Sequence, residues 1–247
     1  MSEMSAAGRE APGAGRRTPR GSAVKPRQAP LRADDGGITT DPKLGGMALT
    51  VGFDLDMTLL DTRPGIKATY DVLSAETGTY IDSDLVVSRL GPPLAEEIAR
   101  WFPAERVEAA VARYRQLYVE YALPGTLTLP GARESIEAIR QRGGRVLVIT
   151  GKYEPNARLQ LDHVGLVADE VVGDLWAETK GTALREHGAS VYVGDHLGDI
   201  RGAKAADAVA VGVATGPYSA AELDAAGADV VLPDLTGFPA WLADHLR

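Results

Sequence analysis

Two carboxylates and a hydroxyl follow a short apolar run near one-fifth of the way along this chain. Asp54, Asp56 and Thr58 come directly after the run that ends at Phe53. Side chains alternate across a strand, so Asp54 and Asp56 point the same way if the strand continues. Ligands bind at the carboxyl ends of strands in open α/β sheets, so a ligand there would meet both carboxylates. The alternative is an ordinary strand that ends in a solvated, helix-capping turn.

Three later segments place polar residues where further strands are expected to end. They are Thr150-Gly151-Lys152, Lys180 at the start of a predicted helix, and Gly194-Asp195-His196-Leu197-Gly198-Asp199. A parallel sheet gathers such ends at one edge. With the first pair, these groups supply a nucleophile, an acid/base, phosphate-binding donors and hard oxygen ligands. That combination suits phosphoryl transfer with magnesium.

Short β-branched runs alternate with segments of helical period after Met47, which is typical of βαβ units around a parallel sheet. The predicted strands are Leu49–Asp54, Arg145–Ile149, Glu170–Val172, Ser190–Gly194, Val209–Val213 and Val230–Leu232. The predicted helices of this region are Gly131–Gln141, Glu154–His163, Thr179–His187, Asp199–Ala205, Ser219–Ala226 and Phe238–Leu246. The predicted fold class is therefore α/β.

One interval, between Asp61 and Pro130, breaks this alternation because no strand is predicted in it. Its amphipathic patterns indicate helices over Ile66–Thr77, Leu94–Phe102 and Glu105–Tyr121. We expect an all-helical, lid-like insertion of about 70 residues, a cap at 63–129, in a core made of 47–62 and 130–247. Lids exclude water and select substrates.

The overall composition excludes several classes of protein. The 247 residues are 45% hydrophobic and 24% charged, which fits a soluble globular chain. The chain has no cysteine, which excludes disulfides, a thiolate nucleophile and a cysteine zinc site and favours the cytoplasm. A formal net charge of −8 argues against nucleic-acid binding, and the apolar runs are far shorter than the roughly 20 residues of a membrane span.

The first 46 residues differ in composition from the rest. They carry eight Lys or Arg and five Asp or Glu, have no aromatic residue and show no apolar periodicity. Such a segment cannot bury enough surface to offset its ordering entropy, so residues 1–46 are predicted to be a disordered tail. A translation start at Met47 is the alternative.

The four motifs, in this order and spacing, resemble those of the haloacid dehalogenase-like hydrolase superfamily, and within it the phosphoglycolate phosphatase-like group with a helical cap. The resemblance covers nearly everything from Met47 to the C-terminus. Pro130-Gly131 before a helix and the Arg89–Leu94 segment are also similar to that group. The resemblance implies a Rossmann-like parallel core with helices on both faces and an inserted helical cap.

The resemblance also implies a role for each matched residue. Asp54 would be the nucleophile that forms an aspartyl-phosphate. Asp56 would protonate the leaving oxygen and then deprotonate the attacking water. Thr150, the Gly151 amide and Lys180 would hold the phosphoryl oxygens.

A Mg²⁺ ion is implied as the cofactor. Its ligands would be Asp54, the backbone carbonyl of Asp56, Asp195, and Asp199 either directly or through water. Mg²⁺ prefers oxygen, so His196 is expected at the rim of the site instead of on the metal.

Three further positions bear on the resemblance. The family commonly has Gly where this chain has Met57, and the usual Pro after the lysine of the third motif is replaced by Gly181. Arg89, in the cap, is a candidate contact for an anionic group of the substrate, with a plain surface arginine as the alternative.

The predicted function is therefore a Mg²⁺-dependent phosphatase acting on a small phosphorylated metabolite, such as a phosphoglycolate-like phosphomonoester. The alternatives are a sugar phosphomutase, a pyrophosphatase or a nucleotidase with the same core, or a binding module that has lost catalysis. We expect a cytoplasmic monomer or homodimer that binds neither nucleic acid nor membrane.

Overall fold

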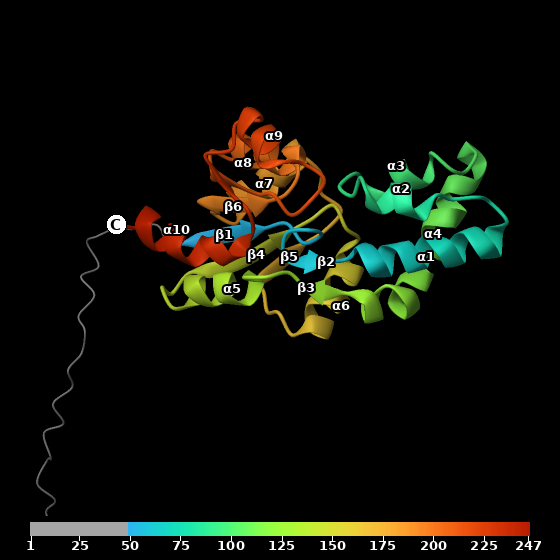
Figure 1. Ribbon diagram of the computed structural model, residues 1–247, viewed down its shortest axis with the longest axis horizontal. Coiled ribbons are helices and arrows are strands. Elements are labelled where there is room, and N and C mark those ends of the chain that lie inside the picture. The colour runs from blue at the N-terminus through green and yellow to red at the C-terminus, as the bar shows by residue number, and fades with distance from the viewer. Residues whose placement is uncertain (1–48) are drawn as a thin grey trace, which may run out of the picture. The chain divides into compact units, whose positions relative to one another are not determined.

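The structure is a computed structural model that describes residues 49–247 (Figure 1). The predicted disordered tail and the alternative start at Met47 lie outside the described residues. The strands are β1 Thr50–Phe53, β2 Leu60–Asp61, β3 Leu127–Thr128, β4 Arg145–Ile149, β5 Glu170–Val172, β6 Val191–Gly194, β7 Val209–Val213 and β8 Val230–Leu232. The α-helices are α1 Arg63–Thr77, α2 Ser83–Val87, α3 Leu94–Ile98, α4 Ala104–Tyr121, α5 Ala132–Arg140, α6 Glu154–Val164, α7 Glu178–Glu186, α8 Leu197–Ala205, α9 Ala220–Ala225 and α10 Phe238–His245.

Six strands form one parallel sheet in the order β5-β4-β1-β6-β7-β8. Strand β1 lies inside the sheet, where Phe53 is in register with Val148 of β4 and Val193 of β6. Chain order reverses direction across β1, and such a switch point opens a crevice at the carboxyl ends of the strands. The sheet therefore brings the residues after β1, β4 and β6 to one edge.

Helices cover both faces of this sheet, and alternation along the strands decides which residues they meet (Figure 1). On β4, Val146 and Val148 belong to a core cluster shared with α5 and α10. Leu147 and Ile149 belong to a second cluster shared with α7, α8 and α9. Each β4 residue from 146 to 149 is fully buried. The predicted α/β class with helices on both faces is confirmed.

Helices α1 to α4 form a third cluster of their own, which includes Ile66, Tyr70, Leu73, Ile98, Tyr114 and Leu117. The prediction that the interval contains no strand is wrong, because β3 lies within it. Leu60 and Asp61 of β2 pair antiparallel with Leu127 and Thr128 of β3. A two-residue strand has too few residues to show a period, so its pairing could not be found from the sequence. The short helix α2 was also not predicted.

Local sequence signals explain how helices α9 and α5 begin. Ser219 and Glu222 form a capping box at the start of α9. Gly131 precedes α5 with φ +82°, and a Cβ there would lie 2.3 Å from the backbone of Leu235. Gly131 therefore permits both the left-handed backbone and the close approach of the segment before α10.

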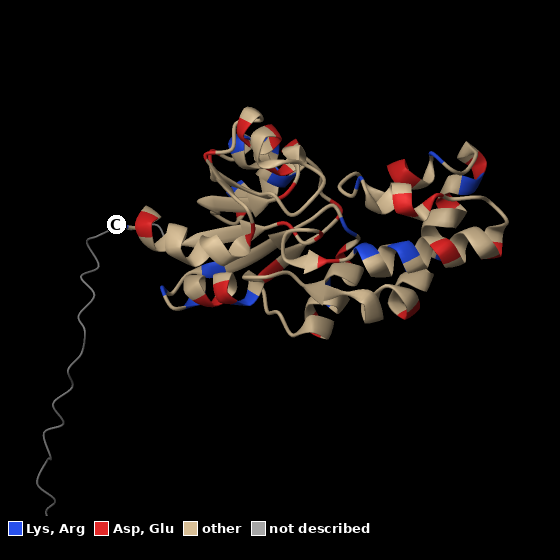
Figure 2. Ribbon diagram, in the orientation of Figure 1, with Lys and Arg blue, Asp and Glu red and all other residues tan. Residues whose placement is uncertain are grey.

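Between residues 49 and 247, no helix is both long and apolar enough to cross a bilayer. Figure 2 shows charges of both signs interspersed over the helices, with the sheet between them largely uncharged.

The packing of α10 on the sheet gives a stability prediction. Phe238 is fully buried, with its ring centroid 5.5 Å from that of Phe53 and 5.3 Å from that of Trp241. Truncation in the Phe238→Ala variant leaves a cavity, so we expect a loss of about 3 to 5 kcal/mol in the free energy of unfolding. Urea denaturation measures it. Val167→Ala, at a side chain that is 66% exposed, is the control and should change stability by less than about 0.5 kcal/mol; equal losses in the two variants would contradict this packing.

Candidate active site

The backbone changes direction between the first two carboxylates. Strand β1 ends at Phe53, and the Asp54 amide still donates to the carbonyl of Val193 at 2.8 Å. Asp56 makes only an isolated bridge to Leu60, so the strand does not continue and its alternation does not set the direction of Asp56. Met57 follows with φ +61°. The resemblance expects glycine at this position, and the left-handed conformation gives the physical reason, since a glycine adopts it at no steric cost.

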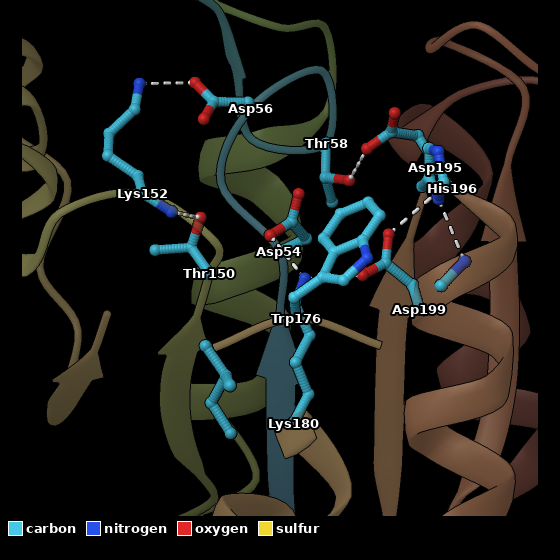
Figure 3. A network of polar contacts seen from close by, with 12 residues as sticks. Asp54, Asp56, Thr58, Thr150, Lys152, Trp176, Lys180, Asp195, His196 and Asp199 are labelled. Atoms are coloured by element: carbon cyan, nitrogen blue, oxygen red, sulfur yellow. Dashed lines mark hydrogen bonds and ion pairs between the residues drawn. The ribbon is translucent and has the colours of Figure 1, made fainter. Parts of the chain in front are cut away.

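Lys180 lies at the centre of the charged cluster. It comes from α7, its side chain is 1% exposed, and its Nζ donates to Asp54 Oδ1 at 2.8 Å and to Asp199 Oδ1 at 2.6 Å (Figure 3). An ammonium buried in this way needs such partners, because an unpaired buried charge is costly. The structure thus brings the first, third and fourth motifs into direct contact.

Asp195 and Asp199 follow β6 at the same edge. Thr58 Oγ1 donates to Asp195 Oδ1 at 2.7 Å. Asp199 Oδ2 accepts the His196 backbone N–H at 3.0 Å, so Asp199 closes a capping box at the start of α8 while Lys180 occupies its other oxygen. Asp199 therefore combines helix capping with an ion pair to Lys180.

The donor set fits a divalent cation. Asp54, Asp195 and Asp199 are all buried, and each offers a carboxylate oxygen within 4.8 Å of the others. Space for the cluster depends on Gly216, where a Cβ would lie 1.8 Å from Asp195 Oδ2. Three converging carboxylate oxygens are typical of hard-cation sites.

Burial and nearby negative charge raise the pKa of Asp54 and of Asp195. Desolvation raises the pKa of Asp54 to about 7, although Lys180 opposes the shift. Desolvation, Asp199 and Asp54 also hold the pKa of Asp195 well above its usual value. For Lys180, burial lowers the pKa, but the two carboxylates outweigh it and the pKa lies well above the ordinary value. A bound cation would relieve the remaining repulsion.

Lys152 lines the site, although the sequence motifs predicted no role for it. Its side chain is 7% exposed, and its Nζ donates to Asp56 Oδ1 at 2.6 Å, to Tyr118 Oη at 2.6 Å and to Gln160 Oε1 at 2.8 Å. Thr62 Oγ1 donates to the same Asp56 oxygen at 2.5 Å. The position of Lys152 in Thr150-Gly151-Lys152 was the one sequence signal that could have pointed to a role in the site. Two of its partners lie on α4 and α6, so the motif does not reveal them.

The polar edge opens into a cavity of ≈ 840 Å³, its mouth included. Thr150, Gly151 and His196 line it, and Thr150 is 1% exposed. His196 was expected at the rim; its Nδ1 accepts the Gly198 N–H at 2.9 Å, and burial lowers its pKa. Arg89 also lines the cavity, but its guanidinium is paired with Glu97 at 2.7 Å, a partner that the sequence did not reveal.

Comparison with known proteins places these features in a family. The family profile described as haloacid dehalogenase-like hydrolase matches residues 51–213. The chain belongs to the haloacid dehalogenase-like hydrolases. The chain is similar to the Probable phosphatase IndB of Dickeya dadantii, with 30% identity over 73% of this chain and 87% of that protein. It is also similar to the Phosphoglycolate phosphatase of Rhodospirillum rubrum, with 31% identity over 79% of this chain and 91% of that protein.

The fold of this haloacid dehalogenase-like hydrolase also recurs among solved structures. The crystal structure of a predicted phosphatase from Clostridium acetobutylicum superposes with a TM-score of 0.70 at 21% identity, covering 81% of this chain and all of that one. The predicted family is confirmed, and with it the expectation of an enzyme.

The raised carboxylate pKa values give a prediction on stability. An acid whose pKa is higher in the folded protein binds its proton more tightly there, so the metal-free fold loses stability as pH rises from 3.8 toward about 7. Asp54→Asn removes this titration. The free energy of unfolding of the variant minus that of the parent should therefore be larger at about pH 8 than at about pH 5. Thermal melts with and without MgCl₂ measure it. Mg²⁺ should raise the melting temperature of the parent more at the higher pH; a pH-independent Mg²⁺ effect would contradict the proposed ligand set.

Proposed function

We propose that the chain is a Mg²⁺-dependent phosphatase that hydrolyses a small phosphorylated metabolite, a phosphomonoester, through an aspartyl-phosphate. The observation that carries the proposal is the buried contact of Lys180 with Asp54 and Asp199 at the carboxyl edge of the parallel sheet. It combines a carboxylate nucleophile, a fixed cation and a hard-cation site. The phosphatase names of two relatives support the reaction class.

In the first step, a carboxylate oxygen of Asp54 attacks phosphorus and the bond from phosphorus to the ester oxygen breaks. The leaving alkoxide takes a proton from Asp56. This nucleophilic route divides one difficult hydrolysis into two easier transfers. Asp54 is only 7% exposed, and this burial keeps competing water away from its carboxylate.

In the second step, water attacks the phosphorus of the aspartyl-phosphate. Asp56 now removes the proton from that water, and the bond to Asp54 breaks to release inorganic phosphate. The two hydrogen bonds that Asp56 accepts both end on Oδ1, from Lys152 and Thr62. Its Oδ2 is therefore the oxygen we assign to the proton.

The phosphoryl oxygens are assigned to Thr150, the Gly151 amide and Lys180, which line one side of the cavity. These fixed donors stabilise charge without reorganisation during the reaction. Asp54, the Asp56 carbonyl and Asp195 would hold Mg²⁺, with Asp199 as a further ligand. When bound, the ion supplies positive charge that lowers the repulsion between the phosphate and the carboxylate nucleophile.

The region 63–129 is assigned as the cap of a core made of 47–62 and 130–247. Gly91 supports this role because it approaches the core closely: a Cβ there would lie 2.6 Å from His196 Cδ2 and 2.9 Å from Trp176. A segment in that position excludes water and contacts the leaving group. The cytoplasmic location and the monomeric or homodimeric state stay predictions.

The proposed nucleophile gives the direct test. Asp54→Asn should lower phosphate release more than about 10³-fold, because the amide is not a nucleophile for phosphorus. The assay is a phosphate-release screen over small phosphomonoesters with MgCl₂. Asp162→Asn, at an exposed carboxylate of α6, is the matched control and should retain full activity. Turnover that survives Asp54→Asn would exclude the mechanism.

A phosphomutase with the same core is distinguished by its products. Incubation with a hexose monophosphate should yield free sugar and inorganic phosphate. Isomerised sugar phosphate without free phosphate would instead support the mutase, and absence of any turnover would support a binding module.

Lys152 gives a second prediction because all three donors of its ammonium are used within the protein, leaving none for substrate. Lys152→Met should therefore lower kcat about 10²-fold by misplacing Asp56, with KM nearly unchanged. Lys204→Met, at an exposed lysine paired with Asp229, is the control.

The choice of substrate sharpens the Lys152 test. With p-nitrophenyl phosphate, whose leaving group needs no proton, the variant should show a rapid burst of nitrophenolate followed by slow turnover. A large rise in KM instead of a fall in kcat would mean that Lys152 binds substrate.

A further inference from the structure

Three polar side chains on the wall of the cavity lack a hydrogen-bond partner among residues 49–247. They are the Asn156 amide and the hydroxyl groups of Tyr70 and Tyr114. The three residues are 5%, 2% and 5% exposed, respectively. Buried polar groups are nearly always hydrogen-bonded, so three exceptions around one cavity call for an explanation.

These three polar groups open into the cavity and are not enclosed by packed atoms. In the part of the chain that the structure describes, the one fully enclosed polar side-chain atom without a partner is Arg115 Nε. The amide and the two phenol oxygens therefore reach open space. Their residues are otherwise buried and line the cavity, so the cavity is that space.

The two tyrosines belong to a row of rings that begins beside the proposed acid/base. Tyr118 Oη accepts from Lys152 Nζ at 2.6 Å, and the same ammonium donates to Asp56 Oδ1 at 2.6 Å. The Tyr114 ring centroid lies 5.9 Å from that of Tyr118, and the Tyr70 centroid lies 4.6 Å from that of Tyr114. In the proposed mechanism the ester oxygen lies within reach of Asp56, so this row borders the leaving group.

The phenols of Tyr70 and Tyr114 are neutral groups that both donate and accept. Burial raises the pKa of each phenol, so both keep their protons. A protonated phenol donates one hydrogen bond and accepts others. A few placed groups of this kind fix the orientation of a small molecule in a site that is otherwise apolar.

Asn156 borders the cavity from the core, in the first turn of α6. Its amide has an NH₂ group that donates and a carbonyl oxygen that accepts. An ionised carboxylate only accepts, so it can pair with the NH₂ group but not with the carbonyl oxygen. A hydroxyl group can pair with either one. The unpaired amide and phenols therefore fit a leaving group that carries hydroxyl.

We infer that Asn156, Tyr70 and Tyr114 bind the leaving group of the substrate, and that this leaving group carries at least one hydroxyl group besides the ester oxygen. The class includes both polyols and hydroxylated acids. The inference rests on the proposed phosphatase function and deepens it. A site built to bond a hydroxyl group discriminates against an analogue that lacks one, because its buried polar groups are then left unpaired.

The test compares two substrates that differ only in hydroxyl groups. Glycerol 3-phosphate and n-propyl phosphate have the same three-carbon skeleton, and only the first has hydroxyl groups on its leaving group. For the parent enzyme, kcat/KM should favour glycerol 3-phosphate at least about tenfold.

Substitutions that remove one polar group each should reduce this preference. Asn156→Ala, Tyr70→Phe and Tyr114→Phe should each lower the ratio of the two kcat/KM values by about three- to tenfold, while hydrolysis of n-propyl phosphate stays nearly unchanged. A merely structural role would slow both substrates equally and keep the ratio. Tyr121→Phe is the matched control, because Tyr121 lies on α4 with Tyr114 but does not line the cavity. Its ratio should equal that of the parent.

The two Tyr→Phe variants keep the test decisive if Asn156→Ala does not fold, because each removes only a hydroxyl group. Suppose that the parent hydrolyses p-nitrophenyl phosphate but does not favour glycerol 3-phosphate, or that all three variants keep the ratio of the parent. Either result would overturn the inference and leave the phosphatase function intact. Phosphate release no faster than that of Asp54→Asn, on these substrates and on the wider screen, would overturn the phosphatase function itself.

Discussion

The buried ion cluster around Lys180 is the interaction on which the site depends. Asp54 and Asp195 directly follow strands β1 and β6, and burial by itself raises the pKa of both carboxylates. Lys180 offsets part of this cost through contacts of 2.8 and 2.6 Å. The remainder is the electrostatic demand that a divalent cation would meet. The same burial that costs the fold stability would strengthen the attraction of these carboxylates for the proposed cation.

A second polar network ties the helical interval to the sheet edge. Lys152 joins Asp56 of the loop after β1 to Tyr118 of α4. Gln160 then donates to Thr126 at 2.8 Å, near the point where the chain returns to the core. The proposed acid/base is therefore anchored by groups from both parts of the chain, and its position depends on how they pack. Gly91 adds a close contact from the same interval over His196 and Trp176.

The departures from the family pattern have local structural consequences. Met57 adopts a backbone conformation that glycine accepts freely, and its side chain is 2% exposed. Burial of the thioether side chain thus accompanies the unfavourable backbone. Gly181, in place of the usual proline, lies where a Cβ would approach Ala205 to 2.9 Å, so the α7 and α8 backbones pack closely beside Lys180.

The six strands of the sheet and the four polar strand ends were predictable from the sequence, because buried parallel strands read as short apolar runs and strand ends interrupt them with charge. The partners of those charges were not. Thr58 meets Asp195 across 137 positions, Lys180 meets Asp54 across 126, and the pairing of Arg89 with Glu97 depends on how α3 follows its loop. The β2–β3 pair was not predicted for a similar reason. Each strand has only two residues, too few to show a period, and the pairing spans the whole helical interval. The sequence by itself determined which residues have the chemistry for phosphoryl transfer and which elements carry them. Only the tertiary structure decided which charges neutralise one another, because desolvation and contact distance are properties of the packed chain.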